Sequence, residues 1–195
     1  TPSPLTEQLE AEGIAVSTLP DVEAIPAGWR ADLSAILTLY TPAIPASLPI
    51  LQLLQRTNTL FKRSEILGWI SQSLPCFAIA GTHGKTTTST LLAHLLNDRC
   101  NAFLGGISAA TGSNLYLSER AQCMVVEADE FDRSFLHLHP THAVITSLDP
   151  DHLDIYGTTE SFVEGFQTFS MQVEDSLLMH HSLIGRLSPG VAVTS

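Results

Sequence analysis

The chain has 195 residues, of which 44% are hydrophobic and 15% are charged, a balance typical of a globular protein rather than a disordered one. Only nine residues are Lys or Arg and the formal net charge is −11, which argues against a nucleic-acid backbone as the main ligand, because neutralising several phosphates needs a basic face. The longest apolar run is far below the roughly 18 residues that a membrane-spanning helix needs, so we expect no membrane insertion.

The first part of the chain, up to about residue 73, alternates helical and extended patterns. The predicted elements are a helix at residues 5–12, strands at residues 14–18 and 34–42, and helices at residues 49–56 and 63–72. An α/β nucleotide-binding domain normally starts with a strand and a glycine-rich turn. Because this chain instead starts with a helix, we expect that the beginning of such a domain is missing.

A second unit is predicted to begin at about residue 73, where Pro75 breaks the preceding helix. Residues 76–80 (CFAIA) have the pattern of a short buried strand, and residues 86–98 have leucines in helical register. Apolar runs at residues 123–130 and 142–150 both end in acidic residues. We interpret them as parallel strands whose carboxyl ends face a ligand cleft.

Two further features are assigned to the hydrophobic core. Residues 159–173 are predicted to form a helix, and its stripe of Phe162, Phe166 and Phe169 indicates core packing rather than a cofactor site. The three cysteines, Cys76, Cys100 and Cys123, are widely spaced, with no CxxC pair and no secretory leader. This pattern favours reduced core thiols in a cytoplasmic protein over a metal or redox role.

The segment AIAGTHGKTTTST, residues 78–90, has the composition of a phosphate-binding loop between a strand and a helix. The longer Walker pattern would need glycine where Ile79 stands, so the match is to the shorter form G-T-x-G-K-T. In such a loop Lys85 reaches the outer phosphates and Thr86 offers a hydroxyl to Mg²⁺. The residues predicted to bind the nucleotide are Gly81, Thr82, His83, Gly84, Lys85, Thr86 and Thr87.

A magnesium nucleotide needs hard oxygen ligands, and Glu127 at the end of an apolar run is the leading candidate. The acids that follow it are either substrate contacts or solvated loop charges: Asp129, Glu130 and Asp132. His152 lies among three aspartates in DPDHLDIYG, so it is either a ligand of a second cation or a structural histidine. His83 either has a functional role or stands in the loop by chance.

Three motifs in this order resemble the Mur ligase family, in its alanine-adding branch: GTHGKTTT, VEADEFDRSFLHLHP and ITSLDPDHLDIYG. YTPAIP and KRSEILG are also similar to the end of the family's UDP-binding domain, so the resemblance covers nearly the whole chain. It implies an α/β fold. Residues 1–72 would be part of a Rossmann-like UDP-binding domain, and residues 73–195 would be the N-terminal part of a P-loop-type central domain with a parallel sheet.

The resemblance also implies roles for single residues, with ATP and Mg²⁺ as cofactors. Lys85, Glu127 and His152 would be catalytic, because Lys85 would hold the outer phosphates of ATP while Glu127, with Thr86, ligates one Mg²⁺ and His152 ligates a second. The residues that would face the sugar nucleotide or the reacting carboxylate are His83, Asp129, Glu130, Asp132, Thr41 and Arg63. Ser147 departs from the family, which often has Asn there.

The implied reaction joins L-alanine to the lactyl carboxylate of UDP-N-acetylmuramate through an acyl phosphate, so the expected partners are these two substrates. Attachment of a preformed tripeptide to the same sugar nucleotide is the nearest alternative. A P-loop NTPase switch would leave DPDHLD unexplained, and an inactive fragment or binding module is a further alternative. We expect these 195 residues by themselves to catalyse little or no ligation.

Overall fold

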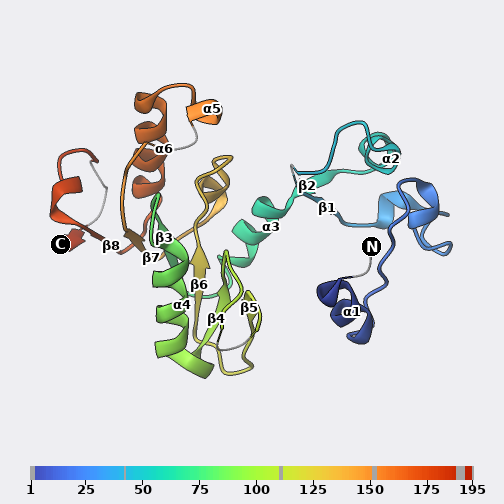
Figure 1. Ribbon diagram of the computed structural model, residues 1–195, viewed down its shortest axis with the longest axis horizontal. Helices are drawn as coiled ribbons and strands as arrows, with labels where there is room; N and C mark the ends of the chain where they lie inside the picture. The colour runs from blue at the N-terminus through green and yellow to red at the C-terminus, as the bar shows by residue number, and fades with distance from the viewer. Residues whose placement is uncertain (1–2, 42, 110–111, 151–152, 188–191, 195) are drawn as a thin grey trace. The chain divides into compact units, whose positions relative to one another are not determined.

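The computed structural model describes residues 3–41, 43–109, 112–150, 153–187 and 192–194 (Figure 1). The chain forms two compact units, Thr1–Arg63 and Ser64–Ser195, called here the N-terminal and the C-terminal unit. No helix among the described residues combines the length and the apolar character that crossing a membrane requires. Each unit is described by itself.

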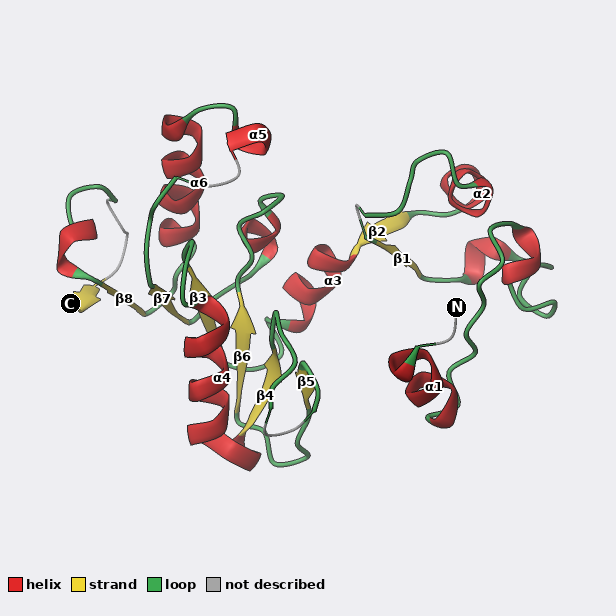
Figure 2. Cartoon of the chain, in the orientation of Figure 1, coloured by secondary structure: helices red, strands yellow, loops and turns green. Residues whose placement is uncertain are grey.

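The N-terminal unit contains short elements joined by long loops (Figure 2). They are α1 (Pro4–Ala11), η1 (Val22–Ala24), η2 (Leu33–Ala35), β1 (Thr38–Tyr40), α2 (Pro49–Thr57) and β2 (Leu60–Lys62), where η denotes a 3₁₀ helix. The strands β1 and β2 pair in parallel. The predicted helices at residues 5–12 and 49–56 are confirmed, and the predicted strand at residues 34–42 is reduced to β1.

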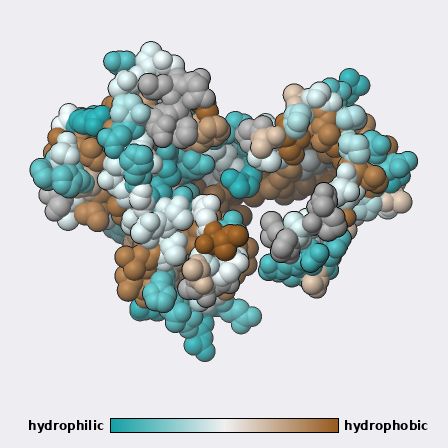
Figure 3. Space-filling view, viewed as in Figure 1, coloured by the Kyte–Doolittle hydropathy of each residue, from teal (hydrophilic) through white to brown (hydrophobic). Residues whose placement is uncertain are grey.

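The predicted strand at residues 14–18 is wrong, because this segment forms neither helix nor strand. A strand needs a neighbour for its backbone hydrogen bonds, and the only strand pairing described in this unit is that of β1 with β2. Ile14 and Thr18 of the segment are therefore exposed, with Ile14 at 50%, and Val16 is half-buried. Apolar side chains reach the surface of both units (Figure 3), and in this one Ile25 and Leu51 are the described hydrophobic residues that are buried.

The C-terminal unit is built around a sheet of seven strands. They are β3 (Cys76–Ala80), β4 (Cys100–Phe103), β5 (Leu115–Tyr116), β6 (Cys123–Glu127), β7 (His142–Ile145), β8 (Ser176–Met179) and β9 (Ala192–Thr194). The helices are α3 (Arg63–Ile70), which starts at the last residue of the N-terminal unit, α4 (Lys85–Leu96), α5 (Leu153–Tyr156), α6 (Thr159–Met171), η3 (Asn97–Arg99), η4 (Ser134–His137) and η5 (His181–Leu183).

The strand order is β5-β4-β6-β3-β7-β8-β9, and every pairing is parallel except that of β4 with β5. β3 lies at the centre, between β6 and β7. After β3 the chain crosses to β4, returns through β6 and then continues outward from β7. The order of the strands therefore reverses around β3, and the carboxyl ends of β3, β6 and β7 meet at one edge, where open α/β sheets bind ligands.

Successive side chains of a strand point to opposite faces of the sheet. Both faces of this sheet carry apolar side chains, and helices cover both. Ala78 and Val126 belong to the cluster that includes the aromatic side chains of α6, whereas Val125 packs with Ala93 of α4. The predicted stripe on α6 is confirmed as core, since Phe162, Phe166 and Phe169 are all fully buried. The stripe packs on Phe135, whose ring lies 5.1 Å from those of Phe166 and Phe169.

The predicted strand at residues 76–80 is confirmed, and the predicted helix at residues 86–98 is confirmed as α4 followed by η3. The helix predicted at residues 63–72 ends earlier, at Ile70. It belongs largely to the C-terminal unit, where a Cβ on Gly68 would overlap the carbonyl of His137 and the His139 amide donates to Ser71 Oγ over 3.1 Å. The assignment of residues 1–72 and 73–195 to two family domains stays a prediction.

The α/β class with a mostly parallel central sheet is confirmed. Cys76, Cys100 and Cys123 are buried and unpaired, as expected for core thiols. β4, β5, β8 and β9 were not predicted from the sequence. β4 and β5 carry the loop that completes one side of the candidate site.

Candidate functional site

The loop of residues 81–84 links the buried strand β3 to α4 at the central edge of the sheet. Its two glycines have positive φ angles, 126° at Gly81 and 80° at Gly84, which L-residues rarely adopt. Gly81 also has no room for a side chain, because a Cβ there would overlap the Thr146 hydroxyl and the Ser147 amide. The chain therefore turns back tightly enough to direct the amino end of α4 at the space above the sheet.

The segment after β7 clamps this loop with two hydroxyl groups. Thr146 Oγ1 donates to the Ala80 carbonyl over 3.0 Å and also to the His83 carbonyl. Ser147 Oγ lies 2.8 Å from Thr82 Oγ1 and accepts a hydrogen bond of 2.8 Å from the His83 amide. The sequence analysis missed the clamp, although the departure of Ser147 from the family pattern marked this position.

The amino end of α4, next to the clamped loop, has the features of an anion-binding site. The first four amide groups of an α-helix, here those of residues 84–87, have no partner within the helix, and the helix dipole is positive at this end. Lys85, Thr86 and Thr87 belong to this first turn. The predicted nucleotide-binding residues thus form one continuous turn from strand to helix.

Glu127 ends β6 and faces the first turn of α4. Its Oε1 accepts a hydrogen bond of 2.9 Å from Thr86 Oγ1, and its Oε2 accepts from the Gly105 amide over 2.8 Å and from Ser89 Oγ over 3.3 Å. A Cβ on Gly105 would overlap this carboxyl group, so any other residue here would displace the Glu127 side chain. Ser89 and Gly105 are site residues that the sequence analysis missed.

These oxygen atoms fit the magnesium site predicted from the sequence. A threonine hydroxyl and a carboxylate are hard ligands, and Mg²⁺ at a nucleotide typically takes one or two such protein ligands and retains several waters. Among the described residues, no group of three or more His, Cys, Asp or Glu is placed to hold a metal ion by itself. The predicted second ligand, His152, lies outside the described residues.

Lys85 and Glu130 form an ion pair beside the loop. Lys85 Nζ lies 2.9 Å from Glu130 Oε1 and 2.8 Å from Oε2, and it donates a hydrogen bond of 2.7 Å to the Gly81 carbonyl. The two side chains are 14% and 2% exposed. Glu130, predicted to face the substrate, is thus buried against the lysine of the loop.

The other predicted acids have local partners. Asp129 is exposed and accepts a hydrogen bond of 3.1 Å from the Phe131 amide, and Asp132 accepts one from Ser134 Oγ. Both therefore shape the turn after β6, and their contact with substrate stays a prediction.

The His83 side chain is 70% exposed, and its Nε2 lies 3.9 Å from Asp149 Oδ2. Thr41 and Arg63 are exposed residues of the N-terminal unit, and their predicted contact with the sugar nucleotide is likewise untested.

Tyr156 supports the turn that carries Glu130. Its hydroxyl donates a hydrogen bond of 2.6 Å to the Glu130 carbonyl, and the Arg133 guanidinium lies 5.1 Å above its ring. Burial raises the pKa of Tyr156 to about 12, with nearby Arg133 opposing and the acids of the turn reinforcing this shift. The phenol is therefore a neutral donor at physiological pH.

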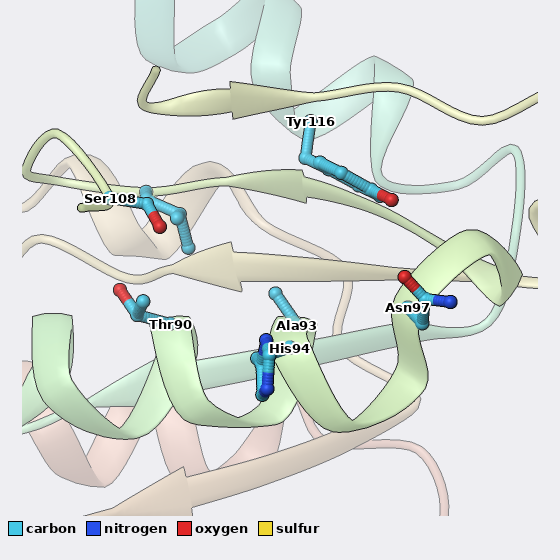
Figure 4. A pocket seen from close by; sticks show the side chains of 7 residues that line it. Thr90, Ala93, His94, Asn97, Ser108 and Tyr116 are labelled. Atoms are coloured by element: carbon cyan, nitrogen blue, oxygen red, sulfur yellow. The ribbon is translucent and has the colours of Figure 1, made fainter. Parts of the chain in front are cut away.

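A pocket of about 250 Å³ lies along the second half of α4. Figure 4 shows Thr90, Ala93, His94 and Asn97 along the helix and its end, with Ser108 and Tyr116 on the opposite side. Its lining does not include the loop of residues 81–87, so the candidate nucleotide site is the turn above the sheet edge rather than this pocket.

The chain is similar to known proteins of one enzyme family. The family model of the Mur ligase middle domain matches residues 79–180, more than half of the chain. Among curated proteins, the UDP-N-acetylmuramate–L-alanine ligase of Porphyromonas gingivalis is 50% identical over 178 residues, which cover 89% of this chain and 39% of that protein. The enzyme of the same name from Flavobacterium johnsoniae is 45% identical over 179 residues, covering 90% and 39%. The chain thus spans about two fifths of the length of these relatives.

Two solved structures share the fold. The UDP-N-acetylmuramate:L-alanyl-gamma-D-glutamyl-meso-diaminopimelate ligase of Neisseria meningitides matches with a TM-score of 0.79 and 21% identity, covering 99% of this chain and 67% of that one. The UDP-N-acetylmuramate-alanine ligase of Thermotoga maritima matches with a TM-score of 0.76 and 22% identity, covering 97% and 44%. At these identities the likeness concerns the fold alone.

Proposed function

The chain belongs to the Mur ligase family, and on this premise we propose that it is part of an ATP-dependent ligase joining L-alanine to the lactyl carboxylate of UDP-N-acetylmuramate. The observation that carries the proposal is the phosphate loop, with Lys85 and Thr86 at the amino end of α4 and Glu127 within hydrogen-bonding distance of Thr86. Relatives that are 45% and 50% identical to the chain bear the name of this activity.

The proposed reaction has two steps. The lactyl carboxylate attacks the γ-phosphorus of ATP, the bond to the bridging oxygen breaks, and an acyl phosphate and ADP form. The amine of L-alanine then attacks the acyl carbon, expels inorganic phosphate and loses a proton to form the amide. The first step brings two anions together, so its barrier is lowered chiefly by positioning and by positive charge.

Each part of the loop has a task in this reaction. The amides of residues 84–87 donate hydrogen bonds to phosphate oxygens at the positive end of α4. Lys85 binds the outer phosphates and offsets the charge that the approaching carboxylate adds. Thr86 and Glu127 would hold Mg²⁺, which would neutralise phosphate charge and polarise the phosphorus–oxygen bonds. His152 is proposed to hold a second Mg²⁺.

The substrate contacts of the other residues are proposals of the same kind. The His83 side chain, Asp129 and Asp132 are proposed to face the sugar nucleotide or its carboxylate, and Thr41 and Arg63 to bind the UDP-sugar. The acidic net charge of −11 is in keeping with small substrates bound at a local cationic site rather than with nucleic acid. We propose a cytoplasmic location, where ATP is available.

Phosphate release measured on the protein as its gene encodes it tests the proposal. We expect release with ATP, Mg²⁺ and UDP-N-acetylmuramate to depend on L-alanine. Dependence on a tripeptide instead of L-alanine would identify the muropeptide-attaching alternative, and release without any carboxylate acceptor would identify an NTPase. The Lys85→Ala variant should abolish release, and a near-normal rate would refute the assignment of the phosphate loop.

A further inference from the structure

Glu130 forms a buried ion pair with Lys85, the lysine on which the proposed function depends. Three oxygen atoms lie within 2.9 Å of Lys85 Nζ: both carboxylate oxygens of Glu130 and the Gly81 carbonyl oxygen. An ammonium group has three N–H donors and no acceptor. Lys85 donates hydrogen bonds to the Gly81 carbonyl and to Glu130 Oε1, whereas the buried Oε2 has only the ion-pair contact. A nucleotide that enters the loop therefore meets an ammonium group that Glu130 and Gly81 already orient.

The backbone of Glu130 is held in place, and its carboxylate is buried against Lys85. The carbonyl of Glu130 accepts hydrogen bonds from the Tyr156 hydroxyl over 2.6 Å and from the Arg133 amide over 3.0 Å. Its side chain is 2% exposed, and a buried carboxylate is costly without a cationic partner. Lys85, by contrast, has a long flexible side chain with single-bond rotations at every carbon. The position of its ammonium group is thus set by Glu130 together with the Gly81 carbonyl.

We propose that Glu130 is a positioning residue that aims Lys85 at the bound nucleotide, an inference that rests on the proposed function. When phosphates occupy the loop, the donor that now bonds the Gly81 carbonyl turns to a phosphate oxygen, while Glu130 retains the other contacts. The carboxylate also repels the phosphates, so it lowers nucleotide affinity while it orients the lysine. Glu130 acts through Lys85 and does not touch the substrate.

This role predicts opposite changes in binding and in turnover. Glu130→Gln removes a negative charge close to the phosphates, so the Kd for a non-hydrolysable ATP analogue with Mg²⁺ should fall by about three- to tenfold. The amide no longer holds the ammonium in one direction, so kcat should fall at least about tenfold. A purely structural role of the pair would instead weaken binding and turnover together, along with thermal stability.

The experiment uses the protein as its gene encodes it. Calorimetric titration with the ATP analogue and Mg²⁺ gives Kd, and phosphate release at saturating substrates gives kcat. Glu164→Gln is the matched control, because Glu164 is an exposed acid on α6 and its change removes the same charge. We expect Kd and kcat of this control to stay within about twofold of the wild-type values.

The outcomes separate the two proposals. A wild-type protein that binds no nucleotide overturns the proposed function and this inference with it. If the wild type binds, a Glu130→Gln variant with unchanged Kd and kcat, or with weaker binding, overturns this inference alone. Should that variant not fold, Glu130→Asp serves instead, because it retains the charge but has a shorter reach. For Glu130→Asp, a near-normal Kd with reduced kcat supports the inference, and parallel losses of binding and turnover overturn it.

Discussion

Thr86 Oγ1 donates a hydrogen bond of 2.9 Å to Glu127 Oε1, which connects the first turn of α4 to the end of β6 across 41 positions of sequence. The contact brings together two oxygen ligands of the type that Mg²⁺ prefers. A cation between them would replace the hydroxyl proton as the partner of the carboxylate. The contact is therefore in keeping with the proposed cation site.

Thr86→Val should impair magnesium-dependent activity, because valine has the same shape but no hydroxyl oxygen. We expect the Mg²⁺ concentration for half-maximal phosphate release to rise at least about tenfold, since even supporting partners of metal ligands contribute that much. Thr86→Ser restores the hydroxyl and should restore the response. Equal Mg²⁺ dependence of the valine variant and the wild type would show that Thr86 is not a ligand.

Ser147→Ala should loosen the phosphate loop, because the His83 amide and the Thr82 hydroxyl lose their partner. Two hydrogen bonds are worth about 1–2 kcal/mol, which corresponds to a rise of roughly five- to thirtyfold in KM for ATP. Ser147→Asn offers a carbonyl oxygen to the same amide, and we expect its KM to stay near the wild-type value. An unchanged KM in the alanine variant would mean that the clamp does not shape the loop.

Gly81→Ala should disrupt the loop for two reasons, a φ angle of 126° and the overlap of a Cβ with Thr146 and Ser147. We expect a loss of at least about 2 kcal/mol in unfolding free energy, together with loss of nucleotide binding. Gly28→Ala is a suitable control, because Gly28 has no atom within 4 Å of an added Cβ. Chemical denaturation of both variants, compared with the wild type, gives the measurement.

The buried thiols should react slowly in the native protein. Burial raises the pKa of Cys76 to about 12 and that of Cys100 to about 11, and it raises the pKa of Cys123 as well, so little thiolate is present at pH 8. We expect slow labelling by a disulfide reagent under native conditions and rapid labelling of all three cysteines in guanidinium chloride. Fast native labelling would contradict the buried positions.

The same shifts predict a loss of stability in alkali. Above about pH 9 an unfolded thiol releases its proton, whereas Cys76 keeps its proton in the folded state until about pH 12. The unfolded state therefore binds fewer protons in this window, and the unfolding free energy falls as pH rises from about 9 to 12. Cys76→Ala should flatten this decline in denaturation curves measured across the range, and an unaltered slope would argue against the assignment.

Local features of the site could be predicted from the sequence because they depend on neighbouring residues. Gly81 and Gly84 have the positive φ angles that a tight loop needs, and the apolar residues 76–80 form the buried strand before it. The strand predicted at residues 14–18 failed because a strand depends on a partner elsewhere in the chain. The unpredicted β4 and β5 are short, with two to four residues each, and so carry little periodicity.

The sequence by itself determined the glycine-rich loop, the buried strand before it, the helix that follows it and the aromatic core of α6, since backbone geometry and side-chain periodicity are local properties. Only the tertiary structure decided that Glu130 holds Lys85 and that Ser147 supports the loop, across 45 and 64 positions. These contacts depend on the order of β6, β3 and β7 in the sheet. That order is set by crossover connections and by packing on both faces, which no short stretch of sequence contains.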